Sequence, residues 1–71
     1  MSPETIPIVL NGRPGEAPRN ATVQDLLDSL DTRGPGLAVA VNEDVVRREA
    51  YATVRLSPGD RVEIIQAVGG G

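Results

Sequence analysis

Thr22-Val23-Gln24-Asp25-Leu26-Leu27-Asp28-Ser29-Leu30 is the stretch of sequence that decides the fold. Its apolar residues recur at i, i+3, i+4 and i+7, which predicts a helix of about nine residues with a single apolar stripe. Thr22 can cap this helix, and Asp25 takes the place where a longer Glu or Gln would complete a capping box. A helix with one apolar stripe packs across one face of a sheet, so the stretch predicts a two-layer α+β domain.

The acidic residues of this helix lie off the apolar stripe. Asp25, Asp28 and Asp31 are spaced i, i+3 and i+6 and could be proposed as a metal cluster. A calcium or magnesium site would need further oxygen ligands from a nearby loop, and the sequence shows no sign of them. A solvated helix face is the preferred interpretation, and we predict no metal site.

A hairpin is predicted before the helix. Ile8-Val9-Leu10 is a short apolar run after Pro7, and we expect it to form a strand with Ile8 and Leu10 on one face. Asn11-Gly12 favours a type I′ turn because both residues tolerate a positive φ. The returning strand, Arg13 to Arg19, contains two prolines, which cannot donate to a ladder and therefore place it at a sheet edge.

Further strands are expected after the helix. Leu37 to Val41 is the most continuous apolar run, of strand length and bounded by turn residues, which predicts a central and well-buried strand. Val45-Val46 predicts a short strand, and a brief apolar stretch at Val54 and Leu56 precedes a turn at Ser57-Pro58-Gly59-Asp60.

The closing strand is predicted from Arg61 to Val68. Val62 and Ile64 alternate with charged residues and should face the core, whereas Ile65 should point outward. We expect three segments: a flexible lead (1–5), the domain (6–67) and a flexible glycine-rich tail (68–71). The expected core is aliphatic: Ile8, Leu10, Val23, Leu26, Leu27, Leu30, Val39, Val41, Leu56, Val62 and Ile64.

Composition argues against autonomous catalysis. The 71 residues include no cysteine and no histidine, so a thiolate nucleophile and the usual general base are both missing. The formal net charge is -3 and the seven cations are scattered arginines, which disfavours nucleic acid as a partner. The sequence shows neither a signal peptide nor a long apolar run, so we expect a cytoplasmic protein.

The final residues, Val68-Gly69-Gly70-Gly71, form a thin backbone without Cβ atoms beyond the first position. Extended, four residues carry the terminal carboxylate roughly 13 Å past the last packed residue, far enough to enter another protein's active site. Taken alone, the tail is equally well interpreted as a frayed end.

Several segments in order resemble one family, the ubiquitin-like sulfur carrier proteins of the ThiS type. The resemblance covers nearly the whole chain from Ile8 onward and implies a β-grasp fold, a mixed sheet of four to five strands with one main helix across one face. The segments are Ile8-Val9-Leu10-Asn11-Gly12, Thr22-Val23 with Asp25-Leu26-Leu27, Val39-Ala40-Val41-Asn42, Val45-Val46-Arg47-Arg48, Gly59-Asp60-Arg61-Val62-Glu63-Ile64 and Val68-Gly69-Gly70-Gly71.

This resemblance implies a carrier that serves as a co-substrate of partner enzymes and is not itself an enzyme. An adenylating partner of the ubiquitin-activating type would use MgATP to activate the carboxylate of Gly71, and the chain itself would hold no cofactor. A cysteine desulfurase or rhodanese-like donor would supply sulfur as a persulfide. The resulting thiocarboxylate would deliver sulfur to thiazole synthase in the thiamine pathway.

Within that scheme, Gly71 carries the sulfur, and Gly69 and Gly70 thread the tail into the partner's site. Ile65, Ala67 and Val68 are the expected docking residues, although Ile65 is equally well an isolated exposed aliphatic residue. Three alternatives stay open: a sibling carrier, as for molybdopterin synthase, tRNA thiolation or cysteine synthesis; a ubiquitin-like modifier attached to lysines; and an interaction module with an incidental glycine tail. The sequence does not decide the sulfur acceptor or the oligomeric state.

Overall fold

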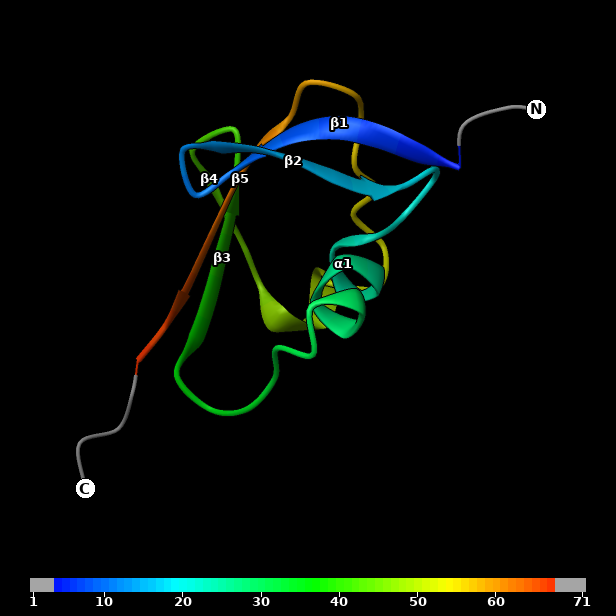
Figure 1. Cartoon of the computed structure of the whole chain (residues 1–71). Helices are drawn as coiled ribbons and strands as arrows, with labels where there is room; N and C mark the ends of the chain where they lie inside the picture. Colours follow the sequence, from blue (N-terminus) through cyan, green and yellow to red (C-terminus); the bar gives the residue numbers. More distant parts are fainter. Residues whose placement is uncertain (1–3, 68–71) are drawn as a thin grey trace.

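The computed structural model describes residues 4–67 as a five-stranded sheet with one α-helix on one side (Figure 1). The strand order is β2-β1-β5-β3-β4, in which β1 and β5 run parallel and the other paired neighbours are antiparallel. The elements are β1 (Thr5–Leu10), β2 (Arg13–Pro18), α1 (Val23–Ser29), β3 (Leu37–Val41), β4 (Asp44–Val46), the 3-10 helix η1 (Arg48–Ala50) and β5 (Arg61–Gln66). The predicted α+β architecture is confirmed.

The capping box at the start of α1 is complete despite the shorter acid. The backbone N–H of Asp25 donates to Thr22 Oγ1 at 3.1 Å, and the N–H of Thr22 donates to Asp25 Oδ2 at 3.0 Å. The helix ends at Ser29, earlier than predicted, and Asp31 adopts a left-handed φ of 55°. The chain therefore turns away at Leu30, which is 43% exposed, and its predicted place in the core is wrong.

Strand β1 begins at Thr5 and is longer than the predicted Ile8-Val9-Leu10 because Pro7 sits where no donor is needed. Val9 donates its N–H to Asp60 O at 2.9 Å. The backbone N–H and C=O groups of the odd-numbered residues of β1 therefore point toward β5 and away from β2. Pro7 shares this direction, and its carbonyl accepts from Gly59 N at 2.7 Å. The proline thus interrupts no bond between β1 and β2.

The hairpin and the edge position of β2 are both confirmed. Asn11 and Gly12 have φ of 50° and 80°, as a type I′ turn requires. In the register, Arg13 and Gly15 of β2 pair with Leu10 and Ile8 of β1. Pro14 lies between these two residues, so its nitrogen points away from β1, as does the nitrogen of Pro18. The prolines therefore line the free side of β2, at the end of the sheet.

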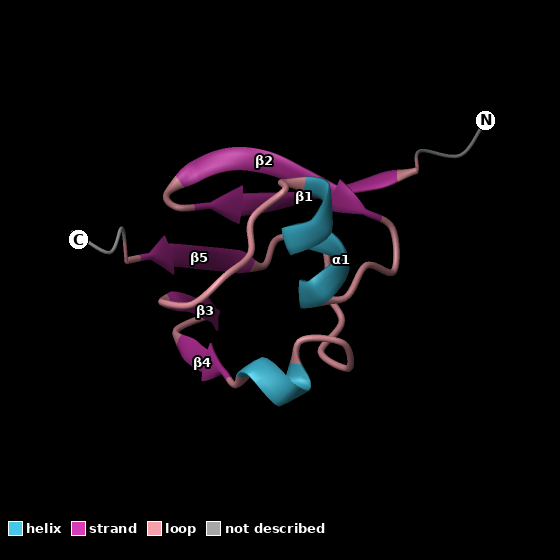
Figure 2. Cartoon of the chain, turned by 90° about the horizontal axis from the view of Figure 1, so that it is seen from below, coloured by secondary structure: helices cyan, strands magenta, loops and turns pink. Residues whose placement is uncertain are grey.

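The centre of the sheet differs from the prediction. β5 is the middle strand, and β3 lies between β5 and β4. Only Val39 of β3 is buried, because α1 covers one face of the sheet and the other face is open (Figure 2). The predicted strand at Leu37 to Val41 is present, but the expectation that it is central and well buried is wrong. The predicted end of the closing strand at Val68 lies outside the described residues, and β5 ends at Gln66.

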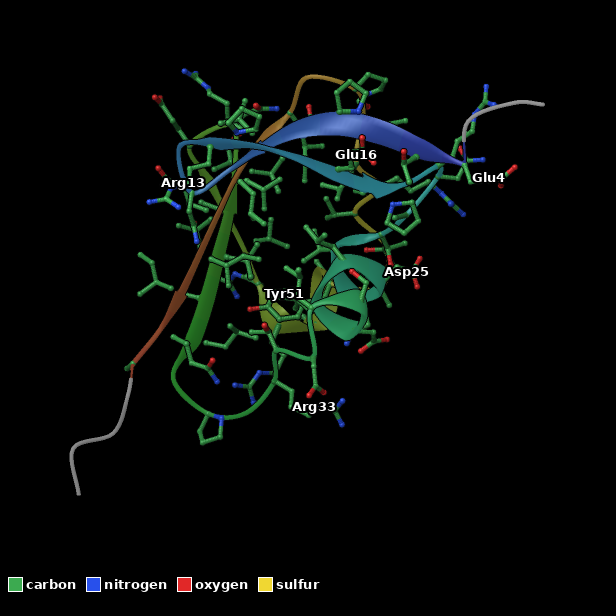
Figure 3. The ribbon with its side chains drawn as sticks, in the orientation of Figure 1. Glu4, Arg13, Glu16, Asp25, Arg33 and Tyr51 are labelled. Carbon is green, nitrogen blue, oxygen red and sulfur yellow. The ribbon has the colours of Figure 1, made fainter. Side chains whose placement is uncertain are left out.

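The core includes most of the predicted residues and several that the periodicity did not indicate. Leu10, Val41 and Ile64 are half-buried against it. Tyr51 is 5% exposed and lies on the helix side of the sheet (Figure 3), so the core is not purely aliphatic as predicted. The buried residues are Ile6, Ile8, Ala17, Ala21, Val23, Leu26, Leu27, Val39, Val46, Tyr51, Leu56 and Val62.

The segment around Val54 and Leu56 packs beside α1 without forming a strand of the sheet. Val23 N donates to Val54 O at 2.9 Å, and Leu56 N donates to Ala21 O at 2.8 Å. The predicted turn follows, with Gly59 at φ 87° and Asp60 N donating to Ser57 O at 3.1 Å. Across residues 4–67, no helix has the length and apolarity to cross a membrane.

Candidate functional site

The candidate site is the end of β5, where the predicted docking residues begin. Ile65 is 64% exposed and points away from α1, as the alternation predicts. Ala67 follows the strand and is exposed. Val68, Gly69, Gly70 and Gly71 lie outside the residues that the structure describes, so their roles stay predictions.

β5 carries this site at one end of the molecule. In Figures 1 and 2 the end of β5 and the start of β1 lie on opposite sides of the domain. As the middle strand, β5 is hydrogen-bonded to β1 on one side and to β3 on the other. The pairing with β1 covers only Arg61 and Val62, so β3 is the strand that holds the C-terminal end of β5.

Two asparagine side chains add to the bonds that hold β5. Asn11 Oδ1 accepts from Ile64 N at 2.8 Å, which continues the pairing of β1 with β5 beyond its two paired residues. Asn42 Oδ1 accepts from Arg61 N at 2.9 Å, while its Nδ2 donates to Asp60 at 3.0 Å. Both asparagines have a positive φ, a conformation that this residue tolerates well. The turn residues of the sequence thus become the anchors of the strand.

The open face of the sheet presents an apolar surface around Ile65. The register places Ala38 opposite Ile65 and Ala40 opposite Val45, so these four residues from β3, β4 and β5 lie on the same face. Val45 is 78% exposed, and the group lines a shallow hollow of about 320 Å³. We call Ala38, Ala40, Val45 and Ile65 the open-face patch. Ala38, Ala40 and Val45 were not predicted as part of a surface, because the run 37–41 was expected to be well buried and Val45 was expected only to lie in a short strand.

Charged residues border the open-face patch. Glu43 and Glu63 line the same hollow as Val45 and Ile65. Arg61 Nη2 lies 3.9 Å from Glu43 Oε2, with both side chains largely exposed. An exposed pair at this distance contributes little to stability. These groups are therefore free to rearrange around a partner.

A loop between α1 and β3 lies against the end of β5. We call residues Arg33-Gly34-Pro35-Gly36 the tail-base loop, and Arg33 lies on it below α1 in Figure 3. Gln66 Nε2 donates to Arg33 O at 2.7 Å, and Ala67 N donates to Gly36 O at 3.0 Å. Sequence reasoning did not predict this contact, because the partners are more than thirty residues apart.

The charged side chains of the described residues are at least partly exposed. No charged residue between residues 4 and 67 is buried. In the same range, no group of three or more acidic, histidine or cysteine side chains could hold a metal ion.

Comparison with known proteins gives consistent matches to sulfur carriers. The model of the ThiS family matches residues 8–71. The sulfur carrier protein ThiS of Escherichia coli is 34% identical over 64 residues, which cover 90% of this chain and 97% of that protein. ThiS of Bacillus subtilis is 38% identical over 50 residues, covering 70% of this chain and 76% of that protein.

A solved structure and a second class of relatives extend these matches. The crystal structure of ThiS from Geobacter metallireducens aligns with a TM-score of 0.78 at 29% identity, covering 93% of this chain and all of that one. This match confirms the predicted β-grasp fold. A thiazole synthase of Paramagnetospirillum magneticum is 34% identical over 64 residues, and this chain spans 20% of its length. The family match and the matches to ThiS proteins show that the chain belongs to the ThiS family of sulfur carrier proteins of thiamine biosynthesis and is a carrier, not an enzyme.

Proposed function

We propose that the Gly71 carboxylate is the group on which sulfur is carried. A partner adenylating enzyme would join a carboxylate oxygen to the α-phosphorus of MgATP, with pyrophosphate leaving. The terminal sulfur of a persulfide, from a cysteine desulfurase or rhodanese-like donor, then attacks the acyl carbon and AMP leaves. A thiol that cleaves the resulting acyl disulfide supplies two electrons and releases the thiocarboxylate.

Thiazole synthase is the proposed sulfur acceptor. Two thiazole synthases contain a segment similar to this chain, with 34% and 38% identity, and that segment amounts to a fifth of their length. Carrier and synthase sequences joined in one polypeptide meet at high effective concentration, which supports a direct transfer between them. We accordingly place this chain in the cytoplasm with its activating enzyme, its sulfur donor and thiazole synthase.

The observation that supports the proposal most strongly is the extent of the family match. It runs to residue 71 and so includes the glycines that come after β5 and Ala67 in the sequence. Gly69 and Gly70 would provide a backbone thin enough to enter the partner's channel. Ile65, Ala67 and Val68 would dock beside it, and the open-face patch would widen that contact. Burial of this apolar surface would offset the cost of ordering the tail, about 1–2 kcal/mol per residue.

Intact-mass analysis of the chain from cells that make thiamine tests this function. We expect a species heavier by the difference between a sulfur and an oxygen atom, located at Gly71 by fragmentation. Deletion of Gly71, or replacement of Gly70 by Trp, should abolish ATP-dependent activation while the melting temperature stays unchanged. Gly15→Ala in β2, where an added Cβ would make only ordinary contacts with Leu10 and Ile8, is the control for a glycine outside the tail.

The same measurement separates the alternatives. Larger adducts on target lysines would indicate a protein modifier. Two strains distinguish a sibling carrier. In that case the thiocarboxylate should stay at its normal level in cells lacking thiazole synthase and should accumulate in cells lacking the other sulfur acceptor. A terminus that stays unmodified while thiamine is being made would show that the proposal is wrong.

A further inference from the structure

Two residues at the end of β5 are held by a segment that is distant in sequence. Leu37 pairs with Gln66 as the last pair between β3 and β5. The hydrogen bond from Ala67 N to Gly36 O, at 3.0 Å, continues this ladder one step beyond the strand. The Gln66 side chain adds a second bond, from Nε2 to Arg33 O at 2.7 Å. Backbone hydrogen bonding therefore holds Ala67, and a side-chain hydrogen bond holds Gln66 as well.

The glycines of the tail-base loop permit this close approach. Gly36 has φ +81°, and a Cβ added there would lie 3.2 Å from both the Cβ and the carbonyl oxygen of Ala67. Gly34 has φ +113°, and its added Cβ would meet Gln66 Nε2 at 3.8 Å. Both backbone conformations favour glycine, and a side chain at Gly36 would push Ala67 away.

We propose that Gln66 and Gly36 are positioning residues that fix Ala67, the residue at which the reactive tail begins. This inference rests on the proposed function, because it concerns how Gly71 reaches a partner's active site. Gln66 and Gly36 act through Ala67. They act on the residue from which positions 68–71 depart.

The position of Ala67 limits where the Gly71 carboxylate can reach. The four residues beyond Ala67 can span at most about 13 Å, so this reach is measured from Ala67. A residue that is ordered before docking also spares the complex the entropy of ordering it. Fixing Ala67 should therefore improve the encounter with the activating enzyme more than the chemical step.

Substitution of Gln66 tests the positioning role without disturbing the fold. Gln66 is exposed and lies outside the core, so its replacement removes no buried contact. Gln66→Glu keeps the shape of the side chain but removes the donor and places a second acceptor against Arg33 O. Gln66→Ala removes the side chain altogether. Gln24 is the only other glutamine of the chain, and Gln24→Glu adds the same charge on α1.

The test combines hydrogen exchange of the Ala67 amide with activation kinetics, using the adenylating enzyme of the source organism and pyrophosphate exchange. Both Gln66 variants should exchange Ala67 about three- to tenfold faster than wild type, the loss of one hydrogen bond. kcat/KM for activation should fall by about the same factor, mainly through KM, while the exchange of core amides stays unchanged. Gln24→Glu should match wild type in both measurements.

The outcomes distinguish this inference from the proposed function. Unchanged Ala67 exchange in both Gln66 variants, or a kcat/KM equal to that of Gln24→Glu, would overturn the positioning role. Failure of the enzyme to activate even the wild-type chain would overturn the proposed function, and the positioning role with it.

Discussion

The two faces of the sheet differ in the exposure of the side chains that the same strands place on them. On β5, Val62 is 1% exposed and packs under α1, whereas Ile65 is 64% exposed on the other face. β4 repeats the contrast, with Val46 at 9% and Val45 at 78%. Alternation along a strand thus gives one face to the core and leaves the other for recognition. Substitutions should affect stability on the covered face and partner binding on the open face.

The largest effect is expected on the covered face. Leu27→Ala should lower the free energy of unfolding by about 2–5 kcal/mol, because it opens a cavity beneath the sheet. Leu30→Ala makes the same chemical change on the same predicted stripe, at a residue that is 43% exposed. It should cost less than about 1 kcal/mol. Urea unfolding of both variants measures the difference, and equal losses would contradict the burial that separates them.

A change on the open face should affect binding first. Ile65→Arg places a charge in the open-face patch and should lower kcat/KM for activation by about tenfold, as expected for loss of an apolar anchor. The free energy of unfolding should change by less than about 0.5 kcal/mol, since Ile65 is exposed. Ala52→Arg adds the same charge at an exposed turn and is the control. If Ile65→Arg lost stability instead of activity, the division between the faces would be wrong.

The smallest expected effect concerns Asn11, whose side chain links the turn after β1 to the backbone of β5, the strand that carries residues of both faces. Asn11→Gly keeps the positive φ of the turn but removes the acceptor for Ile64 N, and should cost about 1 kcal/mol. Asn11→Asp retains an oxygen acceptor and should stay closer to wild type. Exchange of the Ile64 amide is the readout that reports this bond directly. A slow Ile64 amide in Asn11→Gly would show that Asn11 does not hold β5.

Local signals in the sequence predicted the parts of the fold that depend on neighbouring residues. The capping box at Thr22, the turn at Asn11-Gly12 and the edge position of the proline-containing strand β2 follow from side-chain chemistry within a few positions, and all three are confirmed. The same holds for the outward direction of Ile65, which follows from alternation.

The pairing of strands that are distant in the sequence could not be predicted from local signals. Nothing near Leu37 to Val41 indicates that β5 enters the sheet between β1 and β3 and becomes its centre. Tyr51 follows a polar segment, yet η1 turns it into the core. The bond between Gln66 and Arg33 arises only when β5 and the tail-base loop meet. The roles of residues 68–71 rest on the family resemblance and remain predictions.

The prolines of β2 affect how another protein can bind to this edge of the sheet. Pro14 and Pro18 leave Glu16 as the main backbone donor on the free side of this strand, so an incoming strand finds few partners for its carbonyls. Other proteins, and other copies of this chain, are thereby discouraged from joining the sheet at this edge by strand addition. Under the proposed function this would favour prompt release from each partner, because extended main-chain pairing slows dissociation.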